Sequence, residues 1–394
     1  MYNLFFVKEI YKLKFFTKFF VVFLFLLLTF NAFAQVLPGA CQTSEYFTLL
    51  KGKNIAILAN QTSLIEKTHI VDSLISSGIT VKRIFCPEHG LRGTADAGEQ
   101  ISSAIDKKTG LPVISLYGKN KKPTPEQLKG IDYVVFDVQD VGVRFYTYIS
   151  TLHYVMEACA ENNVPLIILD RPNPNSNSID GPVLKSKFKS FVGMHNIPLV
   201  YGMTIGEYAQ MINGEGWLEK GVKCKLQIIR CRNYTHHSVY ILPVKPSPNL
   251  PNQRSVYLYP SLGLFEGTNM SVGRGTDFPF QVIGNPKIDS AKFCFTPVSK
   301  QGAKNPLYEN MKCYGLDLRK SGDTTFTLKY LIEMYKLNPQ KEAFFNPFFN
   351  KLAGNDELIM QIKKGKSEKE IRDSWKADLD KFKLIRKKYL LYPE

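Results

Sequence analysis

Paired cysteines are the first feature that the sequence lacks. It has seven cysteines, an odd number, and none of them is spaced as C-x-x-C. This pattern excludes a small disulfide scaffold. Cys159 and Cys224 are predicted to be small core residues, and a bridge between Cys224 and Cys231 is left open by their spacing.

Several motifs of metal, cofactor and serine chemistry are also absent. The six histidines show no H-E-x-x-H spacing, so no metal site is predicted, and His236 and His237 are expected in a solvated loop. No G-x-G-x-x-G follows the first predicted strand, and residues 273–278 lack its last glycine, which disfavours a dinucleotide cofactor. The absence of G-x-S-x-G removes support for a serine hydrolase. We therefore expect no cofactor.

The N-terminus has the pattern of an export signal. Four lysines between positions 8 and 18 precede an apolar run from Phe19 to Phe30, which Ala32-Phe33-Ala34 follows. A membrane span needs about 20 apolar residues, more than this run supplies. We expect residues 1–34 to be a signal peptide cleaved after Ala34, and the remainder to be periplasmic, without stable membrane insertion. Lipidation at Cys41 is the weaker alternative, because no Leu stands at the spacing that a lipoprotein signal needs.

Positive charge is abundant. The formal net charge is +16, and loss of residues 1–34, with four Lys and one Glu, leaves +16 − 3 = +13. A basic exported protein suggests an anionic partner such as a cell-wall polymer, lipid headgroups or an acidic sugar. Nucleic acid is not an expected partner outside the cytoplasm.

Short apolar runs alternate with helical patterns from Lys53 to about Ile229. This alternation predicts an α/β fold with a Rossmann-like, mostly parallel sheet. The expected strands are 54–59, 81–85, 113–116, 133–138 and 166–169, and the expected helices include 68–76, 148–161 and 205–212. Composition changes near residues 258–262, so we expect a catalytic domain over 35–260 and a smaller α+β auxiliary domain over 261–394. No internal repeat is visible.

The ends of the five predicted strands are polar. Because ligands bind beyond the carboxyl ends of parallel strands, these ends predict a site. The strands run into Asn60-Gln61-Thr62, Pro87-Glu88-His89-Gly90-Leu91-Arg92, Tyr117-Gly118, Asp137 with Gln139-Asp140, and Asp170-Arg171-Pro172-Asn173. Turn and cap roles explain part of this set, the asparagines near 173 above all. Glu88, Asp140 or Asp137, and Asn60 are the best functional candidates.

Aromatic and charged residues gather in two further blocks. Arg144-Phe145-Tyr146-Thr147-Tyr148 follows the fourth strand, and tyrosine faces suit sugar rings. Residues 265–276 contain Glu266, Asn269 and Arg274 between glycines that permit close backbone approach.

At these residues the sequence resembles the exo-β-N-acetylmuramidase family of the NamZ type. The matching stretches include ILANQTS, FCPEHGLRG, FDVQDVGVRFYTYISTLHYVMEA, LDRPNPN, YGMTIGEYAQMINGEGW, PSPNLPN and FEGTNMSVGRGT, over about residues 36–286, with a looser match beyond. The resemblance implies a Rossmann-like N-terminal domain, a C-terminal auxiliary domain and a site in the cleft between them. It further implies release of N-acetylmuramic acid from the non-reducing end of peptidoglycan fragments, with Glu88 as the catalytic carboxylate. Tyr201 departs from the His that many members carry before this glycine, which puts a histidine role there in doubt.

Glycoside cleavage needs a proton donor and stabilisation of a cationic sugar. Glu88 is the predicted general acid, and its partner is Asp140, Asp137 or Glu266, or the acetamido group of the substrate. A muramyl lactyl carboxylate calls for an arginine, which nominates Arg92, Arg144 and Arg274. The remaining predicted binding residues are Asn60, His89, Gln139, Tyr146, Tyr148, Asp170, Arg171, Asn173 and Asn269. A non-catalytic amino-sugar or muropeptide-binding protein is the main alternative.

Overall fold

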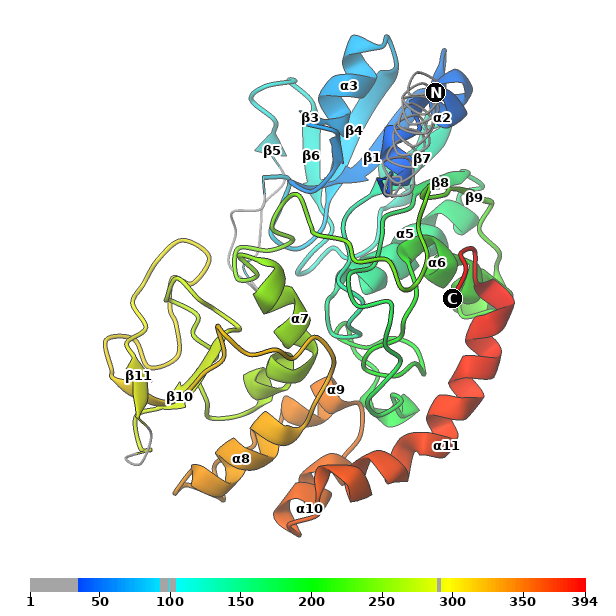
Figure 1. Cartoon of the computed structure of the whole chain (residues 1–394). Coiled ribbons are helices and arrows are strands. Elements are labelled where there is room, and N and C mark those ends of the chain that lie inside the picture. The colour runs from blue at the N-terminus through cyan, green and yellow to red at the C-terminus, as the bar shows by residue number, and fades with distance from the viewer. Residues whose placement is uncertain (1–34, 93–98, 100–103, 289–291) are drawn as a thin grey trace, which may run out of the picture. The chain divides into compact units, whose positions relative to one another are not determined.

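A seven-stranded sheet forms the centre of the first half of the chain (Figure 1). Its order is β5-β6-β4-β1-β7-β8-β9. Every strand is parallel to its neighbours except the short β5, which is antiparallel to β6. The bounds are β1 Asn54–Ala59, β4 Thr80–Cys86, β5 Ala104–Ile105, β6 Pro112–Ser115, β7 Tyr133–Asp137, β8 Leu166–Leu169 and β9 Leu226–Ile229. The five predicted strands are confirmed, and β9 adds an edge strand.

The computed structural model describes residues 35–92, 99, 104–288 and 292–394. The signal peptide expected over residues 1–34 lies outside these ranges. Residues 37–394 form one compact unit. None of the helices in the described part of the chain combines the length and apolar character that a membrane span requires.

Alternate residues of the central strands supply two hydrophobic cores, one on each face of the sheet. Ile55 and Ile57 of β1 face the core that α2 (Thr43–Leu50) and α3 (Ile70–Ser76) cover. Ala56 and Leu58 face the opposite core, which α5 (Tyr148–Glu161) and α6 (Ile205–Gly214) cover. Because successive side chains of a strand point to opposite faces, a strand buried on both sides is apolar throughout.

The predicted helices are confirmed with one shift. The helix α5 has the expected bounds, and α6 runs two residues further than predicted. The helix α3 starts at Ile70 and not at Thr68, because Thr68–His69 forms strand β3 against β2 (Leu64–Ile65). The His69 side chain then accepts a hydrogen bond from the Val71 N–H at the start of the helix. Short helices also form at α4 (Pro125–Leu128), η1 (Gly39–Cys41), η2 (Ser186–Phe188) and η3 (Glu219–Gly221).

The chain after α7 (Gln253–Leu262), called the second half below, is a smaller α+β region. A three-stranded antiparallel sheet has the order β10-β12-β11, with β10 Val282–Asn285, β11 Phe293–Phe295 and β12 Cys313–Asp317. Its helices are α8 Lys329–Leu337, α9 Phe349–Ala353, α10 Glu357–Lys363, α11 Glu368–Arg386 and η5 Lys387–Tyr389. The helix α7 crosses residue 260 and continues as η4 (Gly263–Gly267), so the expected boundary falls inside a helix, and its position stays a prediction.

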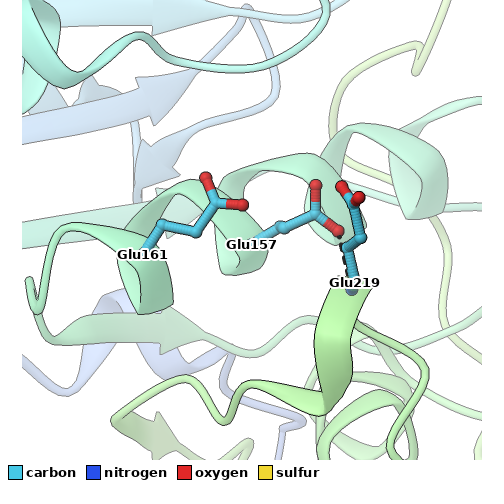
Figure 2. A group of neighbouring side chains, drawn as sticks. All are labelled: Glu157, Glu161 and Glu219. Atoms are coloured by element: carbon cyan, nitrogen blue, oxygen red, sulfur yellow. Dashed lines mark hydrogen bonds between the residues drawn. The ribbon is translucent and has the colours of Figure 1, made fainter.

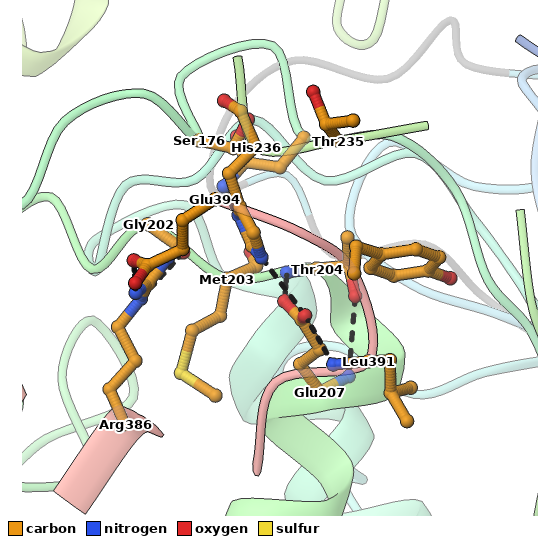
Figure 3. A network of polar contacts seen from close by, with 12 residues as sticks. Ser176, Gly202, Met203, Thr204, Glu207, Thr235, His236, Arg386, Leu391 and Glu394 are labelled. Atoms are coloured by element: carbon orange, nitrogen blue, oxygen red, sulfur yellow. Dashed lines mark hydrogen bonds and ion pairs between the residues drawn. The ribbon is translucent and has the colours of Figure 1, made fainter. Parts of the chain in front are cut away.

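The C-terminal segment after α11 returns to the first half of the chain (Figure 3). The Tyr392 hydroxyl donates to Asp170 at 2.5 Å, and the Leu391 N–H donates to Glu207 Oε1 at 2.8 Å. His236 Nε2 lies 3.0 Å from the same Glu207 oxygen, and His236 is only 2% exposed. The expectation that His236 lies in a solvated loop is therefore wrong, because the returning segment covers it. His237 is exposed, as predicted.

All seven cysteines are free thiols in the structure. Cys159 and Cys224 are buried, as the sequence predicts. The neighbouring Cys224 thiol, together with burial, raises the pKa of Cys159. Cys224 forms no bridge to Cys231.

Candidate active site

A pocket lies where the loops after the parallel strands meet the second half of the chain. The cavity has a volume of about 250 Å³. Its lining residues are Glu88, His89, Tyr117, Phe145, Tyr146, Thr147, Tyr148, Val192, Ser247, Leu250, Tyr259, Glu266, Arg274, Phe280, Phe348 and Leu352. Segments far apart in the sequence therefore share one site, as the position beyond the carboxyl ends of the strands predicts.

The turn after β4 brings Glu88 and His89 to this pocket. His89 has a φ of 69° and Gly90 a φ of 74°. A positive φ is uncommon for a residue with a side chain, so the turn holds His89 in a backbone conformation that the surrounding structure must maintain. The Glu88 carboxylate accepts a hydrogen bond from the Thr147 hydroxyl at 2.7 Å. Glu88 is thus both exposed to the cavity and fixed by a neighbouring loop.

A second carboxylate in the pocket is paired with an arginine. Arg274 donates from Nη2 and Nε to Glu266 Oε1, at 2.7 and 3.2 Å. Its guanidinium also lies 5.0 Å from the centroid of the Phe280 ring. Burial acts to lower the pKa of Arg274, but the Glu266 charge and hydrogen bonds outweigh it and raise that pKa. The pocket therefore holds a permanent cation beside two glutamate carboxyl groups.

Aromatic residues form the walls. Tyr146 and Tyr148 pack edge to face with ring centroids 4.6 Å apart, and both hydroxyls donate to the Pro246 carbonyl, at 2.8 and 3.3 Å. Asn60 does not line the cavity. Its amide donates to the Tyr148 hydroxyl at 2.9 Å, so it supports the wall from behind. Tyr259 continues the wall, with its ring 5.9 Å from that of Tyr146.

Asp137 and Arg171, both predicted to bind substrate, pair with each other inside the fold. Arg171 donates to the two Asp137 oxygens at 2.6 and 2.9 Å, and both residues are buried. Neither lines the pocket. The prediction placed them at the right edge of the sheet, but their charges satisfy one another.

Asp140, the predicted partner of Glu88, lies beneath the site and not in it. It is 3% exposed and accepts hydrogen bonds from the Tyr201 hydroxyl and, at 2.7 Å, from the Gly142 N–H. Its other oxygen is buried with no hydrogen-bond partner among the described residues. Burial raises the pKa of Asp140 to about 6. The structure does not bring this carboxyl to the pocket, so its predicted catalytic role is not supported.

Arg144 was nominated for the lactyl carboxylate, but it is fully buried. One guanidinium nitrogen donates to the Pro182 and Ile197 carbonyls, at 2.7 and 2.8 Å. The other donates to the Leu352 and Ala353 carbonyls at the end of α9, at 2.9 and 2.7 Å. Arg144 thus joins the two halves of the chain and has no terminal nitrogen left for substrate.

Three further predicted binding residues hold backbone in place. Asp170 accepts from the Gly206 N–H at 2.8 Å, at the start of α6, and from Tyr392 of the C-terminal segment. Gln139 donates to two carbonyls, and Asn173 donates to that of Met203 at 2.8 Å. These side chains are buried and do not line the pocket.

Arg92 and Asn269 are also absent from the lining. Arg92 is 49% exposed and pairs with Asp106 at 2.7 Å. Asn269 accepts from the Asn338 amide at 2.9 Å. Of the three nominated arginines, only Arg274 reaches the cavity.

Several lining residues did not stand out in the sequence. Tyr117 lies in the loop after β6, and the strand-end rule pointed to its position without showing that its side chain turns inward. Phe145 and Thr147 stand in the aromatic block after the fourth predicted strand, where only the tyrosines were selected as sugar-binding candidates. Phe280 and Phe348 come from the second half of the chain, where no local pattern marks a residue that faces another segment.

A group of three glutamates outside the pocket has the spacing of a cation site (Figure 2). The carboxylate oxygens of Glu157, Glu161 and Glu219 lie within 4.8 Å of one another. The Lys122 ammonium pairs with Glu157 and Glu161, at 2.7 and 2.8 Å. The lysine offsets part of the acidic charge of this group.

A carboxylic acid, a carboxylate paired with a guanidinium, and aromatic walls in one pocket are the make-up of a sugar-cleaving enzyme. The chain belongs to the exo-β-N-acetylmuramidase NamZ family: residues 55–254 match its N-terminal part and residues 257–392 its C-terminal part. The resemblance seen in the sequence motifs is thereby confirmed.

Relatives of this chain are known from sequence and from structure. It is 40% identical over 375 residues to the peptidoglycan β-N-acetylmuramidase NamZ of Bacillus subtilis (strain 168), with 88% of this chain and 89% of that protein covered. A DUF1343 family protein from Bacteroides fragilis NCTC 9343 has a TM-score of 0.86 at 46% identity, over 92% of this chain and 100% of its own. A second from the same strain has a TM-score of 0.78 at 30% identity, over 91% and 99%.

The buried carboxyl of Asp140 predicts a distinct pH dependence of stability. Because burial raises its pKa to about 6, the folded state holds the proton more tightly than the unfolded chain between about pH 4 and 6. The contribution of Asp140 to the free energy of unfolding should therefore fall as pH rises through this window, by at most about 1.4 kcal/mol per pH unit. Asp140→Asn should remove that slope.

Urea unfolding of both proteins from pH 4 to 7 measures the difference. Asp277→Asn is the control, because the Asp277 side chain is 84% exposed, and it should keep the wild-type profile. A free-energy difference between wild type and Asp140→Asn that stays constant across this range would contradict the assignment.

Proposed function

We propose that this chain is an exo-acting glycoside hydrolase that releases N-acetylmuramic acid from the non-reducing end of peptidoglycan fragments, in the turnover of the cell wall. The observation that carries the proposal is the position of Glu88 in one pocket with the Glu266–Arg274 pair. Membership of the NamZ family and the name of the Bacillus subtilis relative support the same activity.

Glu88 is the group that gives a proton to the glycosidic oxygen. As the bond between the anomeric carbon and that oxygen breaks, its electron pair goes to the oxygen and positive charge develops on the sugar. Glu266 is the one other carboxylate among the described lining residues, and it replaces Asp137 and Asp140 as the candidate that faces this charge. The acetamido group of the substrate is the second candidate for that role.

The size of the pocket supports action at a chain end. Its volume of about 250 Å³ lies below the range of about 300–1,000 Å³ that is common for ligand sites. A cavity of this size suits one sugar unit and not the middle of a polymer. Arg274 supplies a planar cation for the lactyl carboxylate, the group that distinguishes a muramyl sugar from N-acetylglucosamine.

We also propose that the protein works in the periplasm after cleavage behind Ala34. The charged and apolar N-terminal residues and the A-x-A site support this location. N-terminal sequencing of the mature protein from the periplasmic fraction should begin at Gln35. An intact Met1 in the membrane fraction would refute the cleavage.

Glu88→Gln tests the proton donor. The variant should fold and bind substrate, yet lose about 10²- to 10⁴-fold in kcat on the natural disaccharide, because the amide cannot donate the proton. A muramide with a leaving group that hardly needs protonation should show a smaller loss. Glu126→Gln, an exposed residue of α4, is the matched control. Near wild-type turnover of the disaccharide by Glu88→Gln would remove Glu88 from the mechanism.

Arg274→Lys and Arg274→Met test sugar selection. Both should lower kcat/KM on muramides by about 10- to 100-fold, the worth of a hydrogen bond to a charged group. N-acetylglucosaminides lack the carboxylate and should lose less. Arg92→Met is the control, because Arg92 lies outside the pocket lining. Equal losses on the two sugars would show that Arg274 does not read the lactyl group.

A further inference from the structure

Two hydroxyl groups from different loops converge on the Glu88 carboxylate. The Thr147 Oγ1 hydroxyl donates to Glu88 Oε2 at 2.7 Å. The Tyr117 hydroxyl forms a second hydrogen bond with the same carboxylate. Both residues line the pocket. Glu88 therefore has a donor from the loop after β6 and another from the segment that enters α5.

The Thr147 hydroxyl donates a hydrogen bond to Glu88 and does not cap the helix that follows it. It is the N-cap residue of α5, where a threonine side chain normally accepts a hydrogen bond from the first turn of the helix. Here the Thr147 side chain makes no capping bond. Thr147 is 7% exposed, so its hydroxyl is turned inward to the carboxylate and not to solvent.

Tyr117 is held in place as a neutral donor. Its ring packs edge to face on Phe191, with centroids 5.8 Å apart. Phe191 also stacks with Tyr154. Burial, followed by the charge of Glu88 and its hydrogen bond, raises the pKa of Tyr117, so the phenol keeps its proton and can donate it in a hydrogen bond.

We propose that Tyr117 and Thr147 are positioning residues for the reaction: together they hold the Glu88 carboxyl group in one orientation and stabilise the carboxylate that remains after its proton has passed to the glycosidic oxygen. This inference rests on the proposed function. The two hydroxyls keep their own protons throughout, and only the Glu88 proton moves. Their contribution is greatest once Glu88 is charged, so it acts on the rate and not on substrate binding.

The test uses substitutions that remove only the hydroxyls. Tyr117→Phe keeps the ring and Thr147→Val keeps the shape. Each should lower kcat on the natural disaccharide by about 10- to 100-fold, with KM changed by less than about twofold. Tyr154→Phe, the same substitution at another tyrosine that contacts Phe191, should leave both constants unchanged, because Tyr154 does not line the pocket. In the Glu88→Gln background neither substitution should cause a further loss, because groups that act through one residue are not additive.

Crystal structures of the variants give a readout that does not depend on turnover. In the Tyr117→Phe, Thr147→Val double variant the Glu88 side chain should leave its wild-type position or occupy several. A wild-type chain that releases no muramic acid would overturn the proposed function. Three results would overturn the positioning role alone, provided that the wild type turns over. The first is an undiminished kcat in both single variants. The others are losses in the Glu88→Gln background as large as those in the wild-type background, and a Glu88 side chain that keeps its wild-type position in the double variant.

Discussion

The pocket depends on one buried guanidinium. Arg144 lies in the segment between β7 and α5, and its guanidinium donates to four carbonyl oxygens. Two of these oxygens are at the end of α9 in the second half of the chain. The end of a helix carries partial negative charge, so a cation there is favourable. Gly354 follows with a φ of 80°, and a side chain there would meet the guanidinium. Because Leu352 both accepts from Arg144 and lines the cavity, this contact fixes one wall of the site.

The polar edge of the sheet divides its residues between two tasks. Glu88 and His89 turn into the cavity, whereas Asp137, Arg171 and Asp170 satisfy one another or the backbone. Buried charges must be paired, so most of a charged rim is used to hold the rim itself. The few polar groups that face the cavity come from separate loops. The buried pairs behind them hold these loops in place.

The fold was predictable because its signals are local. Alternating apolar runs and helical spacing predicted the strands and α5. The motifs predicted the family. The site was predictable only in part. Glu88, Tyr146 and Arg274 line the pocket, and they were predicted because their types and positions suit the chemistry. Asp140 and Arg144 were predicted in the site but lie outside the pocket lining, because sequence does not show whether a charge at a strand end meets a partner inside the fold. Tyr117 was named at a polar strand end but not among the site residues, because its place in the site comes from contact with Glu88, 29 positions away in the chain.

Position and chemistry converge on a single claim, that one muramyl sugar occupies the pocket with its glycosidic oxygen at Glu88. A crystal structure with N-acetylmuramic acid bound tests this claim most directly. We predict a sugar ring against the tyrosine wall, the anomeric hydroxyl within hydrogen-bond distance of the Glu88 carboxylate, and the lactyl carboxylate at the Arg274 guanidinium. A sugar bound outside this cavity, or bound inside it with its anomeric carbon turned away from Glu88, would contradict the account.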